Sequence, residues 1–333
     1  MQTKIIFHFI SVITFFSISP VLSQDSLFTQ YRQGESREPV RIILDTDMES
    51  DVDDVGTLAL LHALSDLGEA QILATISSST YQWTPPCLDA INTYYGHPDI
   101  PVGTVKENGV YRESRYAKTI AEEFPHDLHA PEDVPDAIEL YRKILSQQPD
   151  QSVVIVTVGY LTNLNHLLKS EADEFSELSG KELVAKKVKL WVCMGGKIPE
   201  GIEHNILIDK QASYEVIPEW NTPIMFSPWD IGNRIMTGAA LKEAAEDHPV
   251  RRSYELFNGL KDRQSWDQSA VLYAVRGLRD YWDAETQGYF KVNIDGSNEW
   301  LPEPDRDHAY LREKMEPEKL AKIIEDLMLQ PPQ

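Results

Sequence analysis

Six acidic side chains lie in one short loop near the start of the chain. An apolar run over residues 40–44 precedes a ten-residue stretch that contains Asp45, Asp47, Glu49, Asp51, Asp53 and Asp54. Helical apolar spacing begins at Val55, and one or two acids would stabilise the N-terminus of that helix. Six carboxylates this close repel one another unless protons or a cation intervene, and Ca²⁺ and Mg²⁺ prefer oxygen ligands. The loop therefore predicts a metal site, against the alternative of a solvated acidic loop.

A strand before the loop and a helix after it must position these acids. In an open α/β sheet, ligands bind at the carboxyl ends of the strands, and the loop follows such an end. Further apolar runs predict strands at residues 71–76, 152–156, 188–194 and 223–226. Amphipathic segments between them predict helices at 87–95, 136–145, 161–169 and 210–217. This alternation predicts an open, mainly parallel, Rossmann-like α/β sheet flanked by helices.

The two ends of the chain carry different signals. Residues 1–23 are typical of a cleavable secretory signal peptide, with Lys4, an apolar centre and a small-residue cleavage site near Ser23. We therefore expect a secreted or periplasmic protein in which residues 24–333 form a single domain. The tail predicts a hairpin, with strands at 289–293 and 299–301, and a last helix at 316–328. No second apolar stretch is long enough to predict a membrane span.

The net charge limits the classes of binding partner, and the cysteine content bears on disulfide formation. The formal net charge of −22 argues against a nucleic-acid polymer or an anionic membrane surface as a partner, but an uncharged nucleoside is compatible with it. Cys87 and Cys193 are a weak disulfide signal, and Cys193 lies in an apolar run that predicts a buried residue. We expect a small-molecule partner.

Familiar acidic motifs compete for the loop. An EF-hand beginning at Asp45 would need glycine at position 50 and glutamate at position 56, where this chain has Ser50 and Gly56. A phosphatase of the haloacid-dehalogenase type also begins with D-x-D after a strand. That hypothesis makes Asp45 the essential residue of a Mg²⁺-dependent enzyme.

A third motif fits the loop best. The order D-T-D, then D-D, then a hydrophobic helix resembles the opening of the inosine-uridine-type nucleoside hydrolases, which are calcium-dependent and cleave N-ribosides. The loop here is two residues longer than the usual one. Later stretches follow the family's order: G-Y-L-T-N ending at Asn163, M-G-G followed by Glu203-His204-Asn205, and Ser265-Trp266-Asp267.

The resemblance implies a set of calcium ligands. They are the carboxylates of Asp47, Asp54 and Asp267 and the backbone carbonyl of Thr162. Judged by residue type alone, Thr162 could equally cap a helix, and Asp267 suits a helix first turn. Asp45 would lie behind these ligands, and Asp51 could replace Asp47.

The resemblance also implies substrate contacts. Asp53 and Asn205 would hold the ribose 2′- and 3′-hydroxyls, and Glu203 would contact the 5′ side. Trp266 stands where many members have a histidine that protonates the leaving base, so it would stack on a purine, with Trp83 across the pocket. Either tryptophan could instead be an ordinary packing residue. His204 is then a candidate acid.

Other positions depart from the family. Residues 77–80 replace a Gly-Asn pair, and Lys197 stands near a missing sugar-binding asparagine, so the changes fall on the 5′ side of the sugar.

The expected chemistry is hydrolysis of an N-glycosidic bond with inversion. Asp47 would take a proton from a metal-bound water, and the carboxylates would stabilise the positive charge that develops on the sugar. Two alternatives remain: a non-catalytic, calcium-dependent sugar-binding protein on the same fold, and the phosphatase. Family members are commonly oligomers, so a homo-oligomer is possible by analogy.

Overall fold

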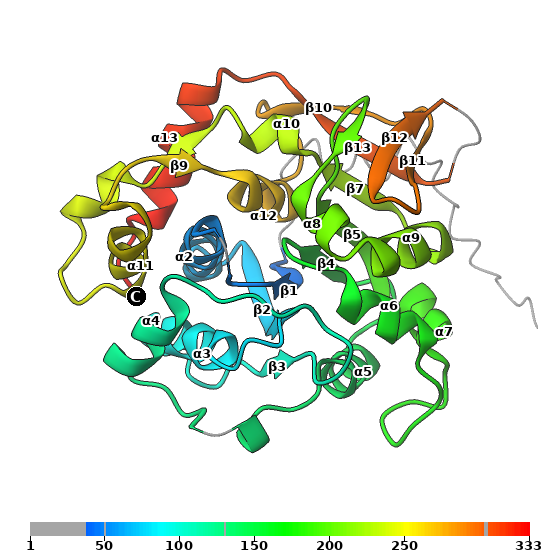
Figure 1. Cartoon of the computed structure of the whole chain (residues 1–333), viewed down its shortest axis with the longest axis horizontal. Helices are drawn as coiled ribbons and strands as arrows, with labels where there is room; N and C mark the ends of the chain where they lie inside the picture. Colours follow the sequence, from blue (N-terminus) through cyan, green and yellow to red (C-terminus); the bar gives the residue numbers. More distant parts are fainter. Residues whose placement is uncertain (1–37, 50, 130, 303–305) are drawn as a thin grey trace, which may run out of the picture.

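An eight-stranded sheet runs through the centre of the molecule (Figure 1). The computed structural model describes residues 38–49, 51–129, 131–302 and 306–333, so the predicted signal peptide lies outside the described residues. The strand order is β10-β13-β7-β5-β4-β1-β2-β3, and all neighbours are parallel except β10 and β13. The strands are β1 (Val40–Thr46), β2 (Ala70–Ser77), β3 (Val102–Thr104), β4 (Val153–Thr157), β5 (Val188–Met194), β7 (Ile224–Ser227), β10 (Trp282–Glu285) and β13 (His308–Glu313). The prediction of a mainly parallel α/β sheet is confirmed.

Helices cover both faces of this sheet. Side chains alternate along β1, so Ile42 and Leu44 join one apolar core while Ile43 joins the other. The first core packs under α2 (Asp53–Asp66), α3 (Thr84–Tyr94), α4 (Ala117–Glu123), α11 (Pro249–Asn258), α12 (Trp266–Arg276) and α13 (Pro317–Met328). The second packs under α5 (Ala137–Gln147), α6 (Thr162–Lys169), α7 (Gly180–Lys187) and α9 (Lys210–Glu219).

Short elements complete the chain. The predicted hairpin is present as β11 (Tyr289–Val292) and β12 (Ser297–Leu301), which form a small antiparallel sheet with β6 (Glu200–Ile202). The remaining elements are α8 (His204–Ile208), α10 (Trp229–Gly232), the β8–β9 pair (Met236–Thr237 and Arg263–Gln264) and two 3-10 turns, η1 (Pro131–Asp133) and η2 (Ala239–Glu243). None of the described helices is long and apolar enough to cross a bilayer.

Cys87 and Cys193 are both buried free thiols. They belong to the two different apolar cores, so the sheet separates them. The expected burial of Cys193 is confirmed.

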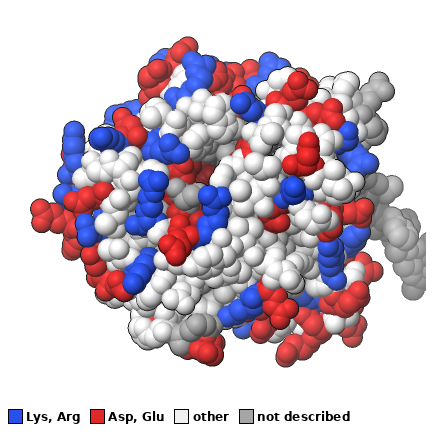
Figure 2. Space-filling view, in the orientation of Figure 1, with Lys and Arg blue, Asp and Glu red and all other residues white. Residues whose placement is uncertain are grey.

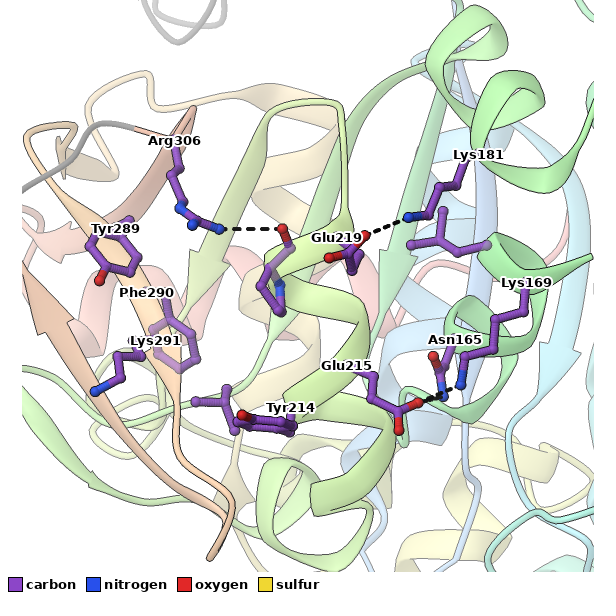
Figure 3. Close-up of a pocket in the computed structure, with 13 residues that line it drawn as sticks. Asn165, Lys169, Lys181, Tyr214, Glu215, Glu219, Tyr289, Phe290, Lys291 and Arg306 are labelled. Carbon is purple, nitrogen blue, oxygen red and sulfur yellow. Dashed lines mark hydrogen bonds and ion pairs between the residues drawn. The ribbon is translucent and has the colours of Figure 1, made fainter.

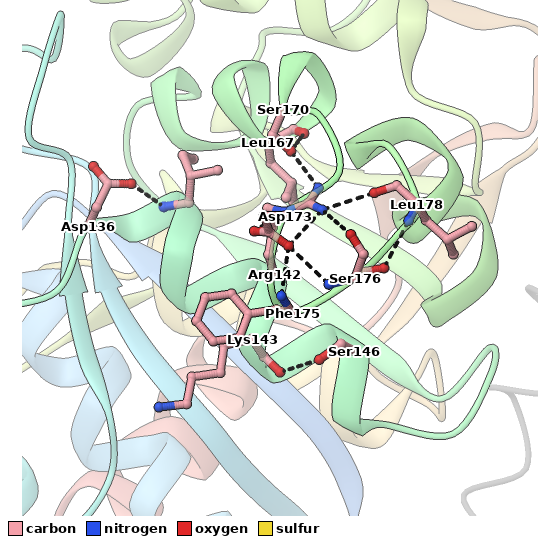
Figure 4. A network of polar contacts seen from close by, with 11 residues as sticks. Asp136, Arg142, Lys143, Ser146, Leu167, Ser170, Asp173, Phe175, Ser176 and Leu178 are labelled. Atoms are coloured by element: carbon pink, nitrogen blue, oxygen red, sulfur yellow. Dashed lines mark hydrogen bonds and ion pairs between the residues drawn. The ribbon is translucent and has the colours of Figure 1, made fainter.

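A buried arginine fastens the loop between α6 and α7 (Figure 4). Arg142 of α5 is 2% exposed. Its guanidinium donates to both carboxylate oxygens of Asp173, at 2.6 and 3.0 Å, and to the hydroxyl of Ser170 at 2.9 Å. It also donates to the carbonyls of Ser176 and Leu178. We call this set the Arg142 network; every donor group of the guanidinium has a partner within the protein.

Candidate active site

The acidic loop lies at the carboxyl end of β1, as predicted. With residues from the ends of β4 and β5, from α2, α8 and α12 and from the β9 region, it lines a cavity of about 270 Å³, which we call the carboxylate cavity. Its lining residues are Asp47, Asp51, Asp53, Asp54, Val158, Met194, Glu203, His204, Asn205, Trp229, Arg263, Trp266 and Asp267. Figure 2 shows the hollow, with acidic atoms inside it and basic side chains around its rim.

Two packed helices bring the central acids together. Asp53 and Asp54 lie in the first turn of α2, Asp267 lies in the first turn of α12, and the two helices are in contact. One carboxylate oxygen from each of these residues lies within 4.8 Å of the others. The amide of Asp267 donates to Asp53 at 3.2 Å, which locks the two helix ends together. These acids are separated by most of the sequence but form one cluster.

The loop is held tightly over the end of β4. An added Cβ on Gly159 would lie 2.6 Å from the Asp47 amide nitrogen and 2.9 Å from its Cβ, so only glycine allows this approach. The Asp47 carboxylate accepts from the Glu49 amide at 3.2 Å, and Asp54 accepts from the Met48 amide at 3.2 Å and from the Thr46 hydroxyl. The backbone thus fixes where these two carboxylates point.

Burial and mutual repulsion raise the pKa of every acid in the cluster. Desolvation is the largest cause for Asp47, Asp53, Asp54 and Asp267, followed by the charges of neighbouring carboxylates. The pKa of Asp54 rises to about 7. The basic lining residue, Arg263, is paired with Asp51, with Nε 2.9 Å from Oδ1. The cluster therefore lacks a cationic partner of its own among the described residues, and its oxygen donors suit a hard divalent cation.

Asp45 does not belong to this cavity. It is fully buried, accepts from the Tyr141 hydroxyl at 2.8 Å and from the Asn163 amide at 3.1 Å, and its pKa is raised to about 7 mainly by burial. A phosphatase would need this side chain to face its substrate. The hypothesis of a phosphatase built on Asp45 is therefore wrong, and the position behind the ligands is the one observed.

The backbone carbonyl in the cavity comes from Val158 rather than Thr162. Thr162 opens α6, and its hydroxyl donates to Asp209 at 2.5 Å, outside the residues that line the cavity. Val158 follows the end of β4 directly and lines the cavity, where its carbonyl accepts from the Asn205 amide at 3.0 Å. The expected Thr162 ligand is corrected, because by that position the chain has already entered the helix.

Glu203 and Asn205 flank His204 at the start of α8. Glu203 is buried and accepts from the backbone amides of Asn205, Ile206 and Gly196, so it both caps the helix and faces the cavity. Burial raises its pKa. Partial burial and the nearby Arg112 lower the pKa of His204, so the neutral imidazole predominates at neutral pH. His204 is in the predicted place, but it is not a ready proton donor.

One predicted tryptophan lines the cavity and the other does not. Trp266 lies beside Trp229, with ring centroids 6.3 Å apart, and its indole NH donates to the Trp229 carbonyl at 2.9 Å. Trp83 lines a separate cavity of about 500 Å³ together with Tyr81 and His126. The expected pairing of Trp83 with Trp266 is wrong, because Trp83 caps α3 and faces the loop that follows α4.

A larger groove of about 720 Å³ lies between α6, α9 and β11 (Figure 3). Its charged side chains neutralise one another: Lys169 pairs with Glu215, and Lys181 pairs with Glu219. No cluster of carboxylates converges there among the described residues. The carboxylate cavity is therefore the candidate active site, although it is the smaller of the two.

Sequence reasoning missed three lining residues of consequence. Trp229 follows the predicted strand at 223–226 by three residues, so an aromatic side chain at a strand end was the available signal. Arg263 lies in the short β9, where no pattern marks a site. Val158 acts through its backbone, which leaves no trace in residue type.

Known proteins share the sequence pattern and the fold of this chain. The family model for the inosine-uridine preferring nucleoside hydrolases matches residues 42–322. A search of curated proteins found no match. Among solved structures, the chain is similar to a purine-preferring ribonucleoside hydrolase from Gardnerella vaginalis, with 16% identity, a TM-score of 0.67, and 86% of this chain and 98% of that chain covered.

Other solved structures share the fold. An inosine-uridine preferring nucleoside hydrolase from Bacillus anthracis is 15% identical, with a TM-score of 0.65 and coverage of 87% of this chain and 99% of that one. The type III effector protein XopQ, solved with adenosine diphosphate ribose, is 15% identical, with a TM-score of 0.67 and coverage of 93% and 99%.

Proposed function

Because this chain belongs to the inosine-uridine preferring nucleoside hydrolase family, we propose that it uses Ca²⁺ to cleave ribonucleosides, with a preference for purine nucleosides, or related ribosides. As a member of that family it is a hydrolase of N-glycosidic bonds. The observation that carries the proposal is the buried cluster of Asp53, Asp54 and Asp267, beside Asp47, in a cavity of about 270 Å³. Buried carboxylates of this kind are costly unless a cation or protons neutralise them.

The oxygen donors divide into two roles. Asp47, Asp54, Asp267 and the Val158 carbonyl would hold the cation, and Asp53 with Asn205 would hold the sugar diol. Bound calcium would supply a positive charge that lowers the pKa of a nearby water. The donor set fits a hard cation because every member offers oxygen and none offers nitrogen or sulfur.

Asp47 would act as the general base. Its carboxylate is fixed by the Glu49 amide at 3.2 Å and lines the same cavity as the diol-binding residues. Asp47 would remove a proton from the attacking water while the C–N bond breaks, and the surrounding carboxylates would stabilise the oxocarbenium-like charge. Attack opposite the leaving group inverts the anomeric centre.

Departure of the base would depend on aromatic contact. Trp266 lines the cavity with one face toward its neighbour Trp229, and stacking on a purine would favour departure of the protonated ring. His204 would assist as an acid only in the small fraction of molecules in which its imidazole is protonated.

We also propose that the protein is exported by its N-terminal segment, and that it can assemble into a homo-oligomer.

Release of ribose tests the function directly. The purified protein is incubated with inosine, adenosine, uridine and ribosyl-nicotinamide, first with calcium and then with a chelator. We expect chelator-sensitive ribose release, fastest from the purine nucleosides. Calcium and ribose binding without any release would instead support a sugar-binding protein on the same fold. Faster release from uridine would remove the purine preference.

A further inference from the structure

We propose that Lys197 makes this cavity select ribosides that carry a negative charge on the part of the molecule facing the rim. The proposal rests on the proposed function and narrows its substrate class. It identifies Lys197 as a specificity residue.

Lys197 is a half-buried cation beside Trp229, a residue of the cavity wall. Its ammonium lies 4.5 Å from the ring centroid of Trp229, which lines the carboxylate cavity. Among the described residues it forms no ion pair, and its side chain makes no hydrogen bond. The chain carries 53 acidic residues and a net charge of −22, so a half-buried lysine without a carboxylate partner is unusual in it. Lys169 and Lys181 in the larger groove between α6, α9 and β11, by contrast, are each paired with a glutamate.

The protein holds this lysine in place at three points. The Lys197 amide donates to the Asn298 side chain at 2.9 Å, and the Lys197 carbonyl accepts from the same side chain at 2.7 Å. Its methylene stem packs on Gly201, where an added Cβ would lie 2.8 Å from Cδ. The ammonium rests over Trp229, whose amide donates to the Gly196 carbonyl at 2.8 Å. A cation fixed in this way has lost little freedom by the time an anion binds.

The neighbouring residues fix the side of the cavity on which Lys197 lies. The adjacent Gly196 amide donates to Glu203 at 3.3 Å, so the lysine lies on the Glu203 side of the cavity. The acids at the bottom would repel an anionic group, which must therefore lie toward the rim.

Two sources could supply the negative charge. A phosphate on the sugar and a carboxylate on the leaving group share the chemistry that Lys197 recognises. We would compare inosine with inosine 5′-monophosphate, and nicotinamide riboside with nicotinic acid riboside. Each pair differs in charge at one end of the molecule only.

The test measures kcat/KM for both pairs in the wild-type protein, in Lys197→Gln, in Lys197→Arg and in the control Lys181→Gln. Lys181 is a surface lysine paired with Glu219 in the larger groove between α6, α9 and β11. We expect the wild type to prefer the anionic member of one pair. Lys197→Gln should reduce that preference by roughly 10- to 100-fold, mainly through KM, since a hydrogen bond to a charged group is lost. Lys197→Arg should keep most of it, and Lys181→Gln should not alter it.

Binding of ribose 5-phosphate, ribose and inorganic phosphate, followed by tryptophan fluorescence, separates the two ways of failing. If no riboside is hydrolysed, the proposed function fails. Tighter binding of ribose 5-phosphate than of ribose, lost in Lys197→Gln, would still support the anion site. Hydrolysis or binding that treats charged and neutral ligands alike, in wild type and variant, would overturn the inference and leave the proposed function standing.

Discussion

Two regions of this protein bury charge in opposite ways. In the Arg142 network one buried cation meets a carboxylate, a hydroxyl and two carbonyls, so each donor is satisfied within the chain (Figure 4). In the carboxylate cavity the nearest charged neighbours of Asp53, Asp54 and Asp267 are other carboxylates. The first region is complete without a ligand, whereas the second becomes complete only with protons or a bound cation.

The difference separates stability from function. An ion pair between a buried arginine and a partly exposed carboxylate, with every donor group satisfied, holds a loop and needs nothing from solution. An unsatisfied cluster lowers the stability of the folded state, which is tolerable where binding restores it. The direction of the pKa shifts follows the same division: the pKa of Asp173 is lowered by Arg142, and the acids of the cavity have raised values.

The largest expected effect is the loss of kcat when an acid of the carboxylate cavity is replaced. Asp47→Asn keeps the shape of the side chain but cannot accept a proton, so kcat should fall by about 10²- to 10⁴-fold. Ribose release at saturating nucleoside and calcium measures it. Asp280→Asn is the matched control, because that side chain is 94% exposed and far from the chemistry. A near-normal kcat in Asp47→Asn would exclude Asp47 as the base.

The next effect breaks the structural side. Arg142→Met fills similar space but leaves Asp173 and the carbonyls of Ser176 and Leu178 without their donor, so the free energy of unfolding should fall by about 2 kcal/mol. Urea denaturation measures the loss, and kcat of the folded fraction should hold. Arg234→Met removes a solvent-exposed pair with Glu313 and should cost less than about 1 kcal/mol. Equal losses in the two variants would contradict the role given to the network.

Calcium should stabilise one region and not the other. At about 100 times its dissociation constant, a ligand adds about 2.7 kcal/mol to the free energy of unfolding, which corresponds to roughly 4 °C in Tm for a chain of this size. We expect that rise in the wild type and in Arg142→Met when calcium replaces chelator. Asp54→Asn should lose most of it. A Tm that is insensitive to calcium in the wild type would mean that the cluster is neutralised by protons alone.

The smallest expected effect is the change of Tm with pH, and its sign differs between the two regions. A carboxyl whose pKa rises from 3.8 to about 7 on folding, as for Asp54, contributes stability that is present below its unfolded value and lost as pH rises through about 7. In chelator, Tm should therefore decline between about pH 4 and pH 7, and calcium should flatten that decline. Asp173 has the opposite sign: its contribution is present at neutral pH and lost on acidification. A chelated protein whose Tm rises steadily from pH 4 to pH 7 would contradict the assignment.

Sequence reasoning found the acids but not everything that surrounds them. The placement of Asp47, Asp53, Asp54 and Asp267 follows from strand ends and motif order, both of which are written in residue types. The role of Val158 could not be predicted, because it contributes a backbone carbonyl. The direction in which Trp83 faces could not be predicted either, because tertiary packing decides the orientation of a helix cap. Lys197 was noted as a departure, yet its contact with Trp229 depends on the hairpin residue Asn298, which is remote in sequence.

The fold shows the same limit. The five predicted strands of the sheet are present because long buried runs are strongly apolar. The strands at 102–104, 282–285 and 308–313 were missed: they are short or carry charged residues at their exposed positions, and their pairing depends on neighbours far along the chain.

The contact of α2 with α12 and α13 has a consequence for how the protein comes into being. The helix that presents Asp53 and Asp54 is synthesised early, but it packs against α12, which carries Asp267, and against the last helix of the chain (Figure 1). A nascent chain on the ribosome, or one clipped by a protease before α12, lacks one wall of the cluster. Such a fragment cannot assemble the three-carboxylate site, so calcium capture reports that the chain has been made and packed at least through α12.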